Sequence, residues 1–244
     1  MEIYKAIVEI CNKLAKKKII KVSTLGKIEN YKLILVEIKK KSKVNGLITA
    51  GFHGNETAPC FAILEFLKNI DDYLPLIKFN LFIIPAVNPT GLKLKRRNDK
   101  WGRNPNRGFV HRLSLLSPEG KIIKEWVIKR KTKFDAFISL HEDPGEHRFY
   151  VYTFERTYKP GKFSFILRNT GAKFFEIKND EEAENGIDFF DCDGSFEDFL
   201  FFLGTPFTAC TETPGKEDFN LRIKANLALI KSFIRFLNNF DKKL

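Results

Sequence analysis

A chain of 244 residues fits one large α/β domain, 1–244, better than two small ones, and it can bury a core without disulfide bonds. Hydrophobic residues make up 43% and charged residues 30%, which is typical of a globular protein and not of a low-complexity chain. The formal net charge of +12 permits contact with nucleic acid, but the lysines are spread along the chain, which favours an ordinary solvated surface instead.

Neither a secretion signal nor a membrane segment is recognisable. Charges interrupt residues 2–18 throughout, unlike a secretory signal. The longest uncharged apolar stretch, 199–211, is too short to span a bilayer and contains Gly204 and Pro206. The four cysteines form no C-x-x-C pair, which favours reduced, buried thiols. We therefore expect a cytoplasmic protein.

In the first half of the chain, the hydrophobic pattern predicts helices and strands in alternation. Apolar residues at helical spacing predict a helix over 3–18, and a second helix is predicted over 57–68. Residues 88–110 are predicted to be loop because Asn-Pro, Thr-Gly and Trp-Gly pairs punctuate them. The predicted strands are 21–25, 32–38, 47–51 and 79–85.

The second half continues the alternation. Its predicted helices are 121–130, 162–169 and 217–240, and its predicted strands are 134–140, 149–154 and 206–211. Such alternation predicts an α/β fold with a mixed, mostly parallel sheet and helices on both faces. Ligands of such folds bind beyond the carboxyl ends of the strands, and polar segments follow several of these strands. We expect those segments to meet at one site.

A short segment with two glycines, Gly-Phe-His-Gly-Asn-Glu at 51–56, follows the third strand. It places His53 and Glu56 three residues apart across a turn, so both side chains can point toward one place. An imidazole and a carboxylate are suitable zinc ligands. Alone, the segment also fits a surface turn with a carboxylate near a helix N-terminus.

A second candidate ligand, His141, follows the predicted strand 134–140 in the segment Ser-Leu-His-Glu-Asp. With the histidine and glutamate of the turn, it completes a set of two imidazoles and one carboxylate. That set leaves one zinc position open, as a catalytic zinc requires. The acids that follow, Glu142 and Asp143, either orient a ligand or bind a substrate amine.

Two further segments carry groups that a hydrolase needs. Glu212 follows the strand 206–211 and could accept a proton from an attacking water, although a solvent-facing acid has the same pattern. The loop 95–107 is rich in arginine, which suits a substrate carboxylate or a developing oxyanion. A basic loop that contacts phosphates is the alternative interpretation.

In their order along the chain, these segments resemble the zinc metallocarboxypeptidase superfamily. It includes carboxypeptidase A-like peptidases and the smaller succinylglutamate desuccinylase/aspartoacylase deacylases. The matching segments are GFHGNE (51–56), NPTG (88–91), KRRND (95–99), NPNR (104–107), SLHED (139–143) and TETPG (211–215). The resemblance implies a metallocarboxypeptidase-like fold, a mixed sheet of about eight strands enclosed by helices.

The resemblance also implies a role for each matching residue, with one zinc ion per chain. The metal ligands are expected to be His53, Glu56 and His141. Glu212 matches the general base and acid, and Arg97 or its neighbour Arg96 matches the arginine that stabilises the oxyanion, with Arg96 otherwise expected on the substrate side. Asn106 and Arg107 match the pair that grips the terminal carboxylate of the substrate.

Three departures from the family pattern stand out. Asn104 stands where the family usually has an aspartate, which we expect to weaken the orientation of the loop or of the ligands. Residues 187–192 contain no tyrosine, although many peptidases of the family have one upstream of the catalytic glutamate. Finally, the short separation between Glu56 and His141 is typical of the compact members.

The leading hypothesis is a carboxypeptidase that removes the C-terminal residue of a peptide. The alternative is an N-acyl amino acid deacylase; either substrate would carry a free carboxylate. A third hypothesis, a non-catalytic basic protein that binds nucleic acid, is disfavoured because all the groups for catalysis are present. No membrane partner is expected, and Phe189, Phe190 and Phe196 either line a specificity pocket or fill the core, of which the core is favoured.

Overall fold

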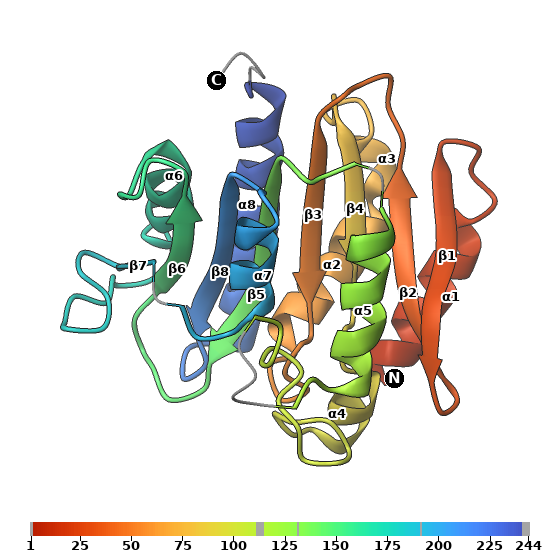
Figure 1. Cartoon of the computed structure of the whole chain (residues 1–244), viewed down its shortest axis with the longest axis horizontal. Helices are drawn as coiled ribbons and strands as arrows, with labels where there is room; N and C mark the ends of the chain where they lie inside the picture. Colours follow the sequence, from red (N-terminus) through yellow and green to blue (C-terminus); the bar gives the residue numbers. More distant parts are fainter. Residues whose placement is uncertain (1, 111–114, 131, 191, 241–244) are drawn as a thin grey trace.

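A computed structural model describes residues 2–110, 115–130, 132–190 and 192–240, in which eight strands form one sheet between two layers of helices (Figure 1). The strands are β1 (Ile20–Ile28), β2 (Tyr31–Ile38), β3 (Asn45–Ala50), β4 (Asn80–Ile84), β5 (Ala136–Asp143), β6 (Tyr150–Glu155), β7 (Ile187–Phe189) and β8 (Phe207–Pro214). The helices are α1 (Ile3–Leu14), α2 (Ala58–Lys68), α3 (Ile70–Tyr73), α4 (Pro89–Leu94), α5 (Pro118–Lys129), α6 (Lys162–Gly171), α7 (Phe196–Phe202) and α8 (Phe219–Asn238).

The strand order is β1-β2-β4-β3-β5-β8-β6-β7. Its centre is parallel, because β3 pairs with β4 and β5 in parallel, and β5 pairs in parallel with β8. The pairs β1–β2, β2–β4 and β6–β8 are antiparallel, and β6–β7 is parallel. The predicted α/β class with a mixed, mostly parallel sheet is confirmed.

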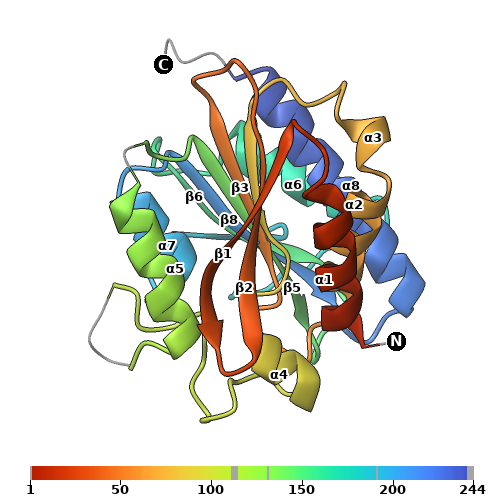
Figure 2. The same ribbon diagram turned by 90° about the vertical axis from the view of Figure 1, so that its right-hand side faces the viewer.

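Helices cover both faces of the sheet, as Figure 2 shows. One face packs against α5 and α7, and the other against α1, α2, α6 and α8. Every residue of β3 is buried, which is expected of a central strand covered on both sides. Phe196 is buried in the core, as favoured from the sequence, whereas Phe189 and Phe190 are partly buried and pack against the hydrophobic clusters.

The structure corrects the predicted elements in two places. The first helix ends at Leu14 and not at residue 18, because the apolar repeat stops there and lysines follow. The predicted loop 88–110 begins with the short helix α4, whose N-terminus is capped by Asn88 and begins with Pro89. The hydrophobic pattern did not indicate α3, β7 and α7, which are all seven residues or shorter.

The burial of the cysteines and the apolar character of the helices bear on two of the predictions. Three of the cysteines are buried free thiols, but Cys192 is exposed, so the prediction of buried thiols is wrong for that residue. Within the described residues, no helix combines the length and apolar character needed to cross a bilayer.

Candidate active site

The polar segments singled out above meet at the carboxyl edge of the parallel strands, at the lower end of the sheet in Figure 1. His53 and Glu56 lie in the turn between β3 and α2, next to β5, which carries His141. In the register of the sheet, His141 lies opposite Glu212 of β8. The order of the strands thus brings together four residues from three segments that are far apart in the sequence.

Glycines allow the turn after β3 to form. Gly51 has a φ of +70°, a conformation that residues with a side chain rarely adopt. At Gly54, a Cβ atom would lie only 1.9 Å from the carbonyl carbon of Gly91, so the turn can pack on α4 only without a side chain there. This contact fixes the direction in which the turn presents His53.

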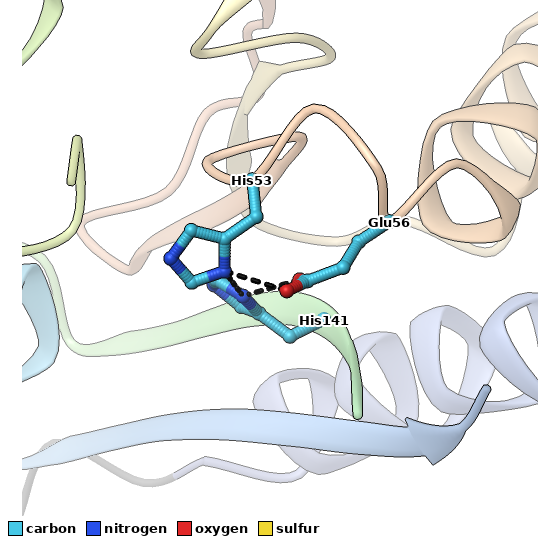
Figure 3. Close-up of side chains that lie close together, drawn as sticks. All are labelled: His53, Glu56 and His141. Carbon is cyan, nitrogen blue, oxygen red and sulfur yellow. Dashed lines mark hydrogen bonds and ion pairs between the residues drawn. The ribbon is translucent and has the colours of Figure 1, made fainter. Parts of the chain in front are cut away.

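Three side chains from this edge form a compact buried cluster (Figure 3). His53 Nδ1 lies 2.7 Å from Glu56 Oε1, and His141 Nδ1 lies 2.9 Å from Glu56 Oε2. The two Nδ1 atoms are 3.2 Å apart. A metal ion could be held by this group of residues.

The spacing of these donor atoms is close to what a small tetrahedral metal requires. Zinc bonds of about 2.0–2.1 Å place neighbouring ligand atoms roughly 3.3 Å apart. The three separations of 2.7, 2.9 and 3.2 Å need only a slight expansion to reach that value. Two imidazoles and one carboxylate also match the donor set of catalytic zinc. The residues therefore fit a zinc ion with one position left for water or substrate.

The outer nitrogen of His53 is held by Asn104. Asn104 Oδ1 lies 3.0 Å from His53 Nε2 and also accepts from the backbone N–H of Asn106. Because that oxygen only accepts, His53 carries its proton on Nε2 and keeps Nδ1 free for a metal. Asn104 thus still supplies an oriented acceptor, although the sequence analysis expected its departure from aspartate to weaken this contact.

His141 is oriented in the same way by a residue that the sequence analysis missed. Its Nε2 lies 2.8 Å from Ser139 Oγ, which in turn accepts from Thr49 Oγ1 on the neighbouring strand. Ser139 precedes His141 by two positions in β5, so both side chains leave the same face of the strand. That spacing was a signal for the contact.

In the cluster, burial and the neighbouring charges shift the pKa values of Glu56 and His141 in opposite directions. Burial favours the neutral form of Glu56, but the two neighbouring histidines outweigh it and lower the pKa of the carboxyl group. Burial lowers the pKa of His141, although Glu56 partly opposes this. Glu56 as an anion and His141 as a neutral imidazole are the protonation states in which each can bind a metal.

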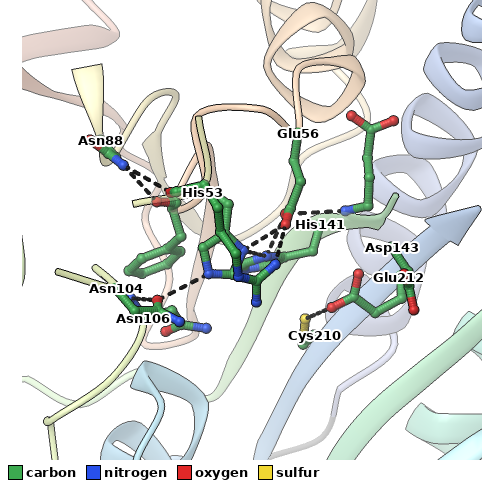
Figure 4. A network of polar contacts seen from close by, with 12 residues as sticks. His53, Glu56, Asn88, Asn104, Asn106, His141, Asp143, Cys210 and Glu212 are labelled. Carbon is green, nitrogen blue, oxygen red and sulfur yellow. Dashed lines mark hydrogen bonds and ion pairs between the residues drawn. The ribbon is translucent and has the colours of Figure 1, made fainter. Parts of the chain in front are cut away.

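Glu212 lies beside this cluster, across the β5–β8 register from His141 (Figure 4). Its Oε1 lies 3.4 Å from Cys210 Sγ, and its buried Oε2 has no hydrogen-bond partner among the described residues. Burial and the charge of Glu56 raise the pKa of Glu212 well above its ordinary range, whereas Arg97 lowers it. A carboxyl group with a raised pKa and a free oxygen is suited to proton transfer.

The two neighbouring arginines point to different places. The Arg97 guanidinium donates to Glu56 Oε1 at 3.0 Å and lines the cavity beside the cluster. Arg96 is exposed and donates to the backbone carbonyl of Asp99 at 2.9 Å. Of the two, only Arg97 lies where an oxyanion near the cluster would form.

Asn106 and Arg107 already have partners. The Asn106 side chain accepts from the backbone N–H of Phe196 at 3.0 Å and donates to Glu197 Oε2 at 3.0 Å. The amide oxygen and one amide N–H of Asn106 therefore hold α7 to the loop, and these two bonds leave its second N–H unused. Arg107 forms an ion pair with Asp193 and lines the cavity. A substrate carboxylate would compete with Asp193 for this guanidinium.

Glu142 and Asn88 brace the ligand-bearing segments from outside the cavity. Glu142 accepts from the backbone N–H of Ala58 at 2.9 Å and pairs with Arg222, so it ties β5 to α2 and α8. Asn88 donates to the Phe52 carbonyl at 3.1 Å, next to His53 (Figure 4). Neither residue is placed to bind a substrate amine.

A cavity of about 370 Å³ opens beside the cluster. Its lining residues are mostly polar: His53, Arg97, Asn106, Arg107, His141, Tyr150, Tyr152, Glu182, Asp188, Asp193, Ser195, Glu197, Cys210 and Glu212. Tyr150 lies opposite Glu212 in the β6–β8 register and donates to Asp143 Oδ2 at 3.1 Å. Phenol groups therefore reach the cavity from β6, although residues 187–192 contain no tyrosine.

Comparison with known proteins agrees with this geometry. The family model of the succinylglutamate desuccinylase/aspartoacylase catalytic domain matches residues 43–142, which include the three residues of the cluster. No curated protein sequence matches the chain significantly.

Solved structures give a match over nearly the whole chain. One from Shewanella amazonensis is 33% identical, covers 96% of this chain and 92% of its own, and has a TM-score of 0.85. One from Shewanella denitrificans is 35% identical, with coverages of 98% and 90% and a TM-score of 0.86. Both are provisionally named metallopeptidases.

A more distant structure has the same fold. A metallo-carboxypeptidase from Burkholderia cenocepacia is 14% identical and has a TM-score of 0.75, with coverages of 96% of this chain and 69% of its own. From the identity to the Shewanella proteins, the family model and the shared fold, this chain belongs to the zinc carboxypeptidase-like superfamily of hydrolases.

Proposed function

We propose that the protein is a zinc-dependent metallocarboxypeptidase that hydrolyses the C-terminal peptide bond of its substrate. The observation that carries the proposal is the convergence of the two Nδ1 atoms and Glu56 with a separate carboxylate, Glu212, beside one cavity; its Oε2 has no hydrogen-bond partner among the described residues. Zinc at the cluster would polarise the scissile carbonyl and acidify a water molecule. The names of the Shewanella relatives support a peptidase.

Each residue of the site then has its own role in the reaction. Glu212 takes a proton from the attacking water at its free Oε2 and later passes a proton to the leaving amine. Arg97, half-exposed at the mouth of the cluster, moves from Glu56 toward the carbonyl oxygen as negative charge develops there. His53, Glu56 and His141 serve as the metal ligands.

Arg107 is the group that we assign to the terminal carboxylate of the substrate. A guanidinium binds a carboxylate through two parallel hydrogen bonds, and Asp193 now occupies that guanidinium. Exchange of Asp193 for the substrate carboxylate keeps Arg107 paired throughout. Asn106 also lines the cavity, and its bonds to Phe196 and Glu197 leave one amide N–H that can donate to the same carboxylate.

The second candidate is an N-acyl amino acid deacylase. It is favoured by the family model, which is named for succinylglutamate desuccinylase and aspartoacylase. The same cluster and the same proton transfers would cleave an acyl amide, since both reactions hydrolyse an amide next to a free carboxylate. The size of the group on the acyl side separates the two functions.

A matched substrate panel decides between them. Zinc-loaded protein is offered blocked dipeptides with different C-terminal residues and, in parallel, acetylated and succinylated amino acids; release of free amino groups is measured. Hydrolysis of the dipeptides with slower turnover of the simple acyl amino acids supports the carboxypeptidase. Turnover of acyl amino acids without any peptide hydrolysis would instead establish the deacylase.

A further inference from the structure

The segment at the end of α4 carries charge of nearly one sign. Residues 93–103 include six basic residues and one acid, Asp99, which is fully buried. Arg97 pairs with Glu56, and Lys100 pairs with Glu29. The other basic residues of the segment have no carboxylate within ion-pair distance in the described part of the chain: Lys93, Lys95, Arg96 and Arg103. The segment therefore presents an excess of cations at the surface.

Two large apolar side chains are exposed in the same segment. Leu94 is 50% exposed and Trp101 is 49% exposed. Single exposed apolar residues are common on protein surfaces, but these two have neighbours that contact the same hairpin turn between β1 and β2. Lys93 Nζ lies 5.9 Å from the centre of the Tyr31 ring, and Lys100 forms its ion pair with this turn. Residues 93–103 and the turn 29–31 thus form one surface, here called the docking patch.

Hydrogen bonds hold Trp101 in this patch. Asp99 Oδ1 accepts from the backbone N–H groups of Trp101 and Arg103, each at 2.8 Å. The backbone of Asp99 also donates to the Arg103 carbonyl at 2.9 Å and accepts from Gly102 at 3.1 Å. A closed turn with a buried anchor therefore presents the indole at the surface. A side chain that is ordered before binding loses little entropy when it enters an interface.

The docking patch lies at the end of the molecule that carries the active site. In both Figure 1 and Figure 2, α4 and the β1–β2 turn lie at the lower end, where the central parallel strands have their carboxyl ends. The same segment carries Arg97, which lines the cavity. A partner bound to the patch would therefore lie next to the active-site end of the molecule.

We propose that the docking patch binds the surface of an anionic lipid bilayer. Its lysines and arginines are attracted to acidic headgroups, and Trp101 and Leu94 enter the boundary between headgroups and acyl chains. No helix of the described residues can cross a bilayer, but a surface that lies on the headgroups needs no spanning helix. This inference goes beyond the proposed function and does not depend on it.

Single-stranded nucleic acid is the competing partner. Cations that contact phosphates and an aromatic ring that stacks on a base are the usual elements of such a site, and the patch has both. Leu94 decides between the two, because an aliphatic side chain does not stack on a base but does enter a lipid interface. The pairing of an exposed leucine with an exposed tryptophan among cations therefore favours the lipid surface.

Vesicle binding tests the proposal on the zinc-loaded wild-type protein. Cosedimentation is measured with vesicles of phosphatidylcholine alone and with vesicles that also contain phosphatidylserine, at low and at high salt. We expect binding to the anionic vesicles to be at least about tenfold tighter than binding to the neutral ones. High salt should weaken it, because salt screens the charges. Equal binding to both kinds of vesicle, or to neither, would overturn the proposal.

Variants of the apolar residues separate the docking patch from general charge attraction. Trp101→Ser and Leu94→Ser should each weaken binding to anionic vesicles by about fivefold, because each removes the side chain that enters the interface. Leu76→Ser is the matched control, since Leu76 is 57% exposed but follows the acidic helix α3, and binding should not change. Equal affinities in all three variants and the wild type would contradict the proposal.

A pair of charge variants tests the cations in the same way. Lys93→Gln combined with Lys95→Gln should weaken binding by about tenfold. Lys162→Gln combined with Lys173→Gln removes the same charge from exposed positions on and after α6 and should have little effect. Equal losses in the two double variants would show that only the net charge of the protein matters, which would also contradict the proposal.

The last measurement identifies the residue in the lipid and the kind of partner. Brominated phospholipids in the anionic vesicles should quench the tryptophan emission of the wild type, and the quenching should disappear in Trp101→Ser, which retains Trp126. Quenching that persists in Trp101→Ser, or tight binding of single-stranded RNA without binding of anionic vesicles, would refute the assignment. None of these readouts requires turnover, so a failure of the proposed peptidase activity leaves them interpretable.

Discussion

The two sides of the cavity are built in different ways. On the metal side, the ligands lie at or just after the ends of adjacent strands, and His53 and His141 are each held by a second side chain, Asn104 or Ser139. On the substrate side, Asn106 and Glu197 come from segments 91 residues apart that are joined by a side-chain hydrogen bond and not by strand pairing. The first side holds the groups that carry out the reaction, and the second side contacts the substrate.

This difference predicts a graded response to substitution. Changes on the metal side should affect catalysis of every substrate, because all substrates use the same groups. Changes at Arg107 and Asn106, which line the cavity, should affect the binding of the substrate. The following predictions test that division, from the largest expected effect to the smallest.

Glu212→Gln should lower kcat by about 10³-fold, because a neutral amide of the same shape cannot accept the proton of the attacking water. The variant should still bind zinc, since Glu212 is not part of the ligand cluster. Steady-state kinetics and metal analysis on the same preparation check both statements. Activity close to the wild type would remove Glu212 from the proposed role.

Arg97→Ala should lower kcat by about 10²-fold through loss of oxyanion stabilisation. The matched control is Arg96→Ala, which removes the same charge from an exposed position outside the cavity and should change kcat little. Because Arg97 also contacts Glu56, zinc affinity is measured for both variants. Equal losses of kcat in the two variants would show that only the charge of the loop matters.

Asn104→Ala should weaken zinc binding by about 10- to 100-fold, because His53 then loses the acceptor that orients it. Asn104→Asp replaces the amide oxygen with a carboxylate and should tighten binding relative to the wild type, since it makes the imidazole more basic. Competition with a chelator measures both affinities. An unaffected affinity in Asn104→Ala would mean that the turn alone positions His53.

Much of the fold and of the metal cluster could be predicted from the sequence. Strand ends followed by histidine and glutamate are local patterns, and the convergence of parallel strands at one edge is a general property of such sheets. The orienting contact of Ser139 with His141 was also predictable in principle, since two residues two positions apart in a strand share a face.

The contact between Glu197 and Asn106 was not predictable in the same way. Glu197 lies in a seven-residue helix that the hydrophobic pattern did not reveal, and its partner Asn106 is far away in the chain. Asn106 matched a substrate-binding residue of the family by its motif, which did not indicate its bonds to Phe196 and Glu197. Such contacts depend on how loops pack, which short-range patterns do not specify.

The central claim is that His53, Glu56 and His141 hold a zinc ion. The most direct test is the metal content of purified wild-type protein beside His53→Ala, both after incubation with zinc and removal of excess. We predict about one zinc per chain in the wild type and its loss in the variant. Wild-type protein without zinc, or a variant that keeps the same amount, would contradict the account.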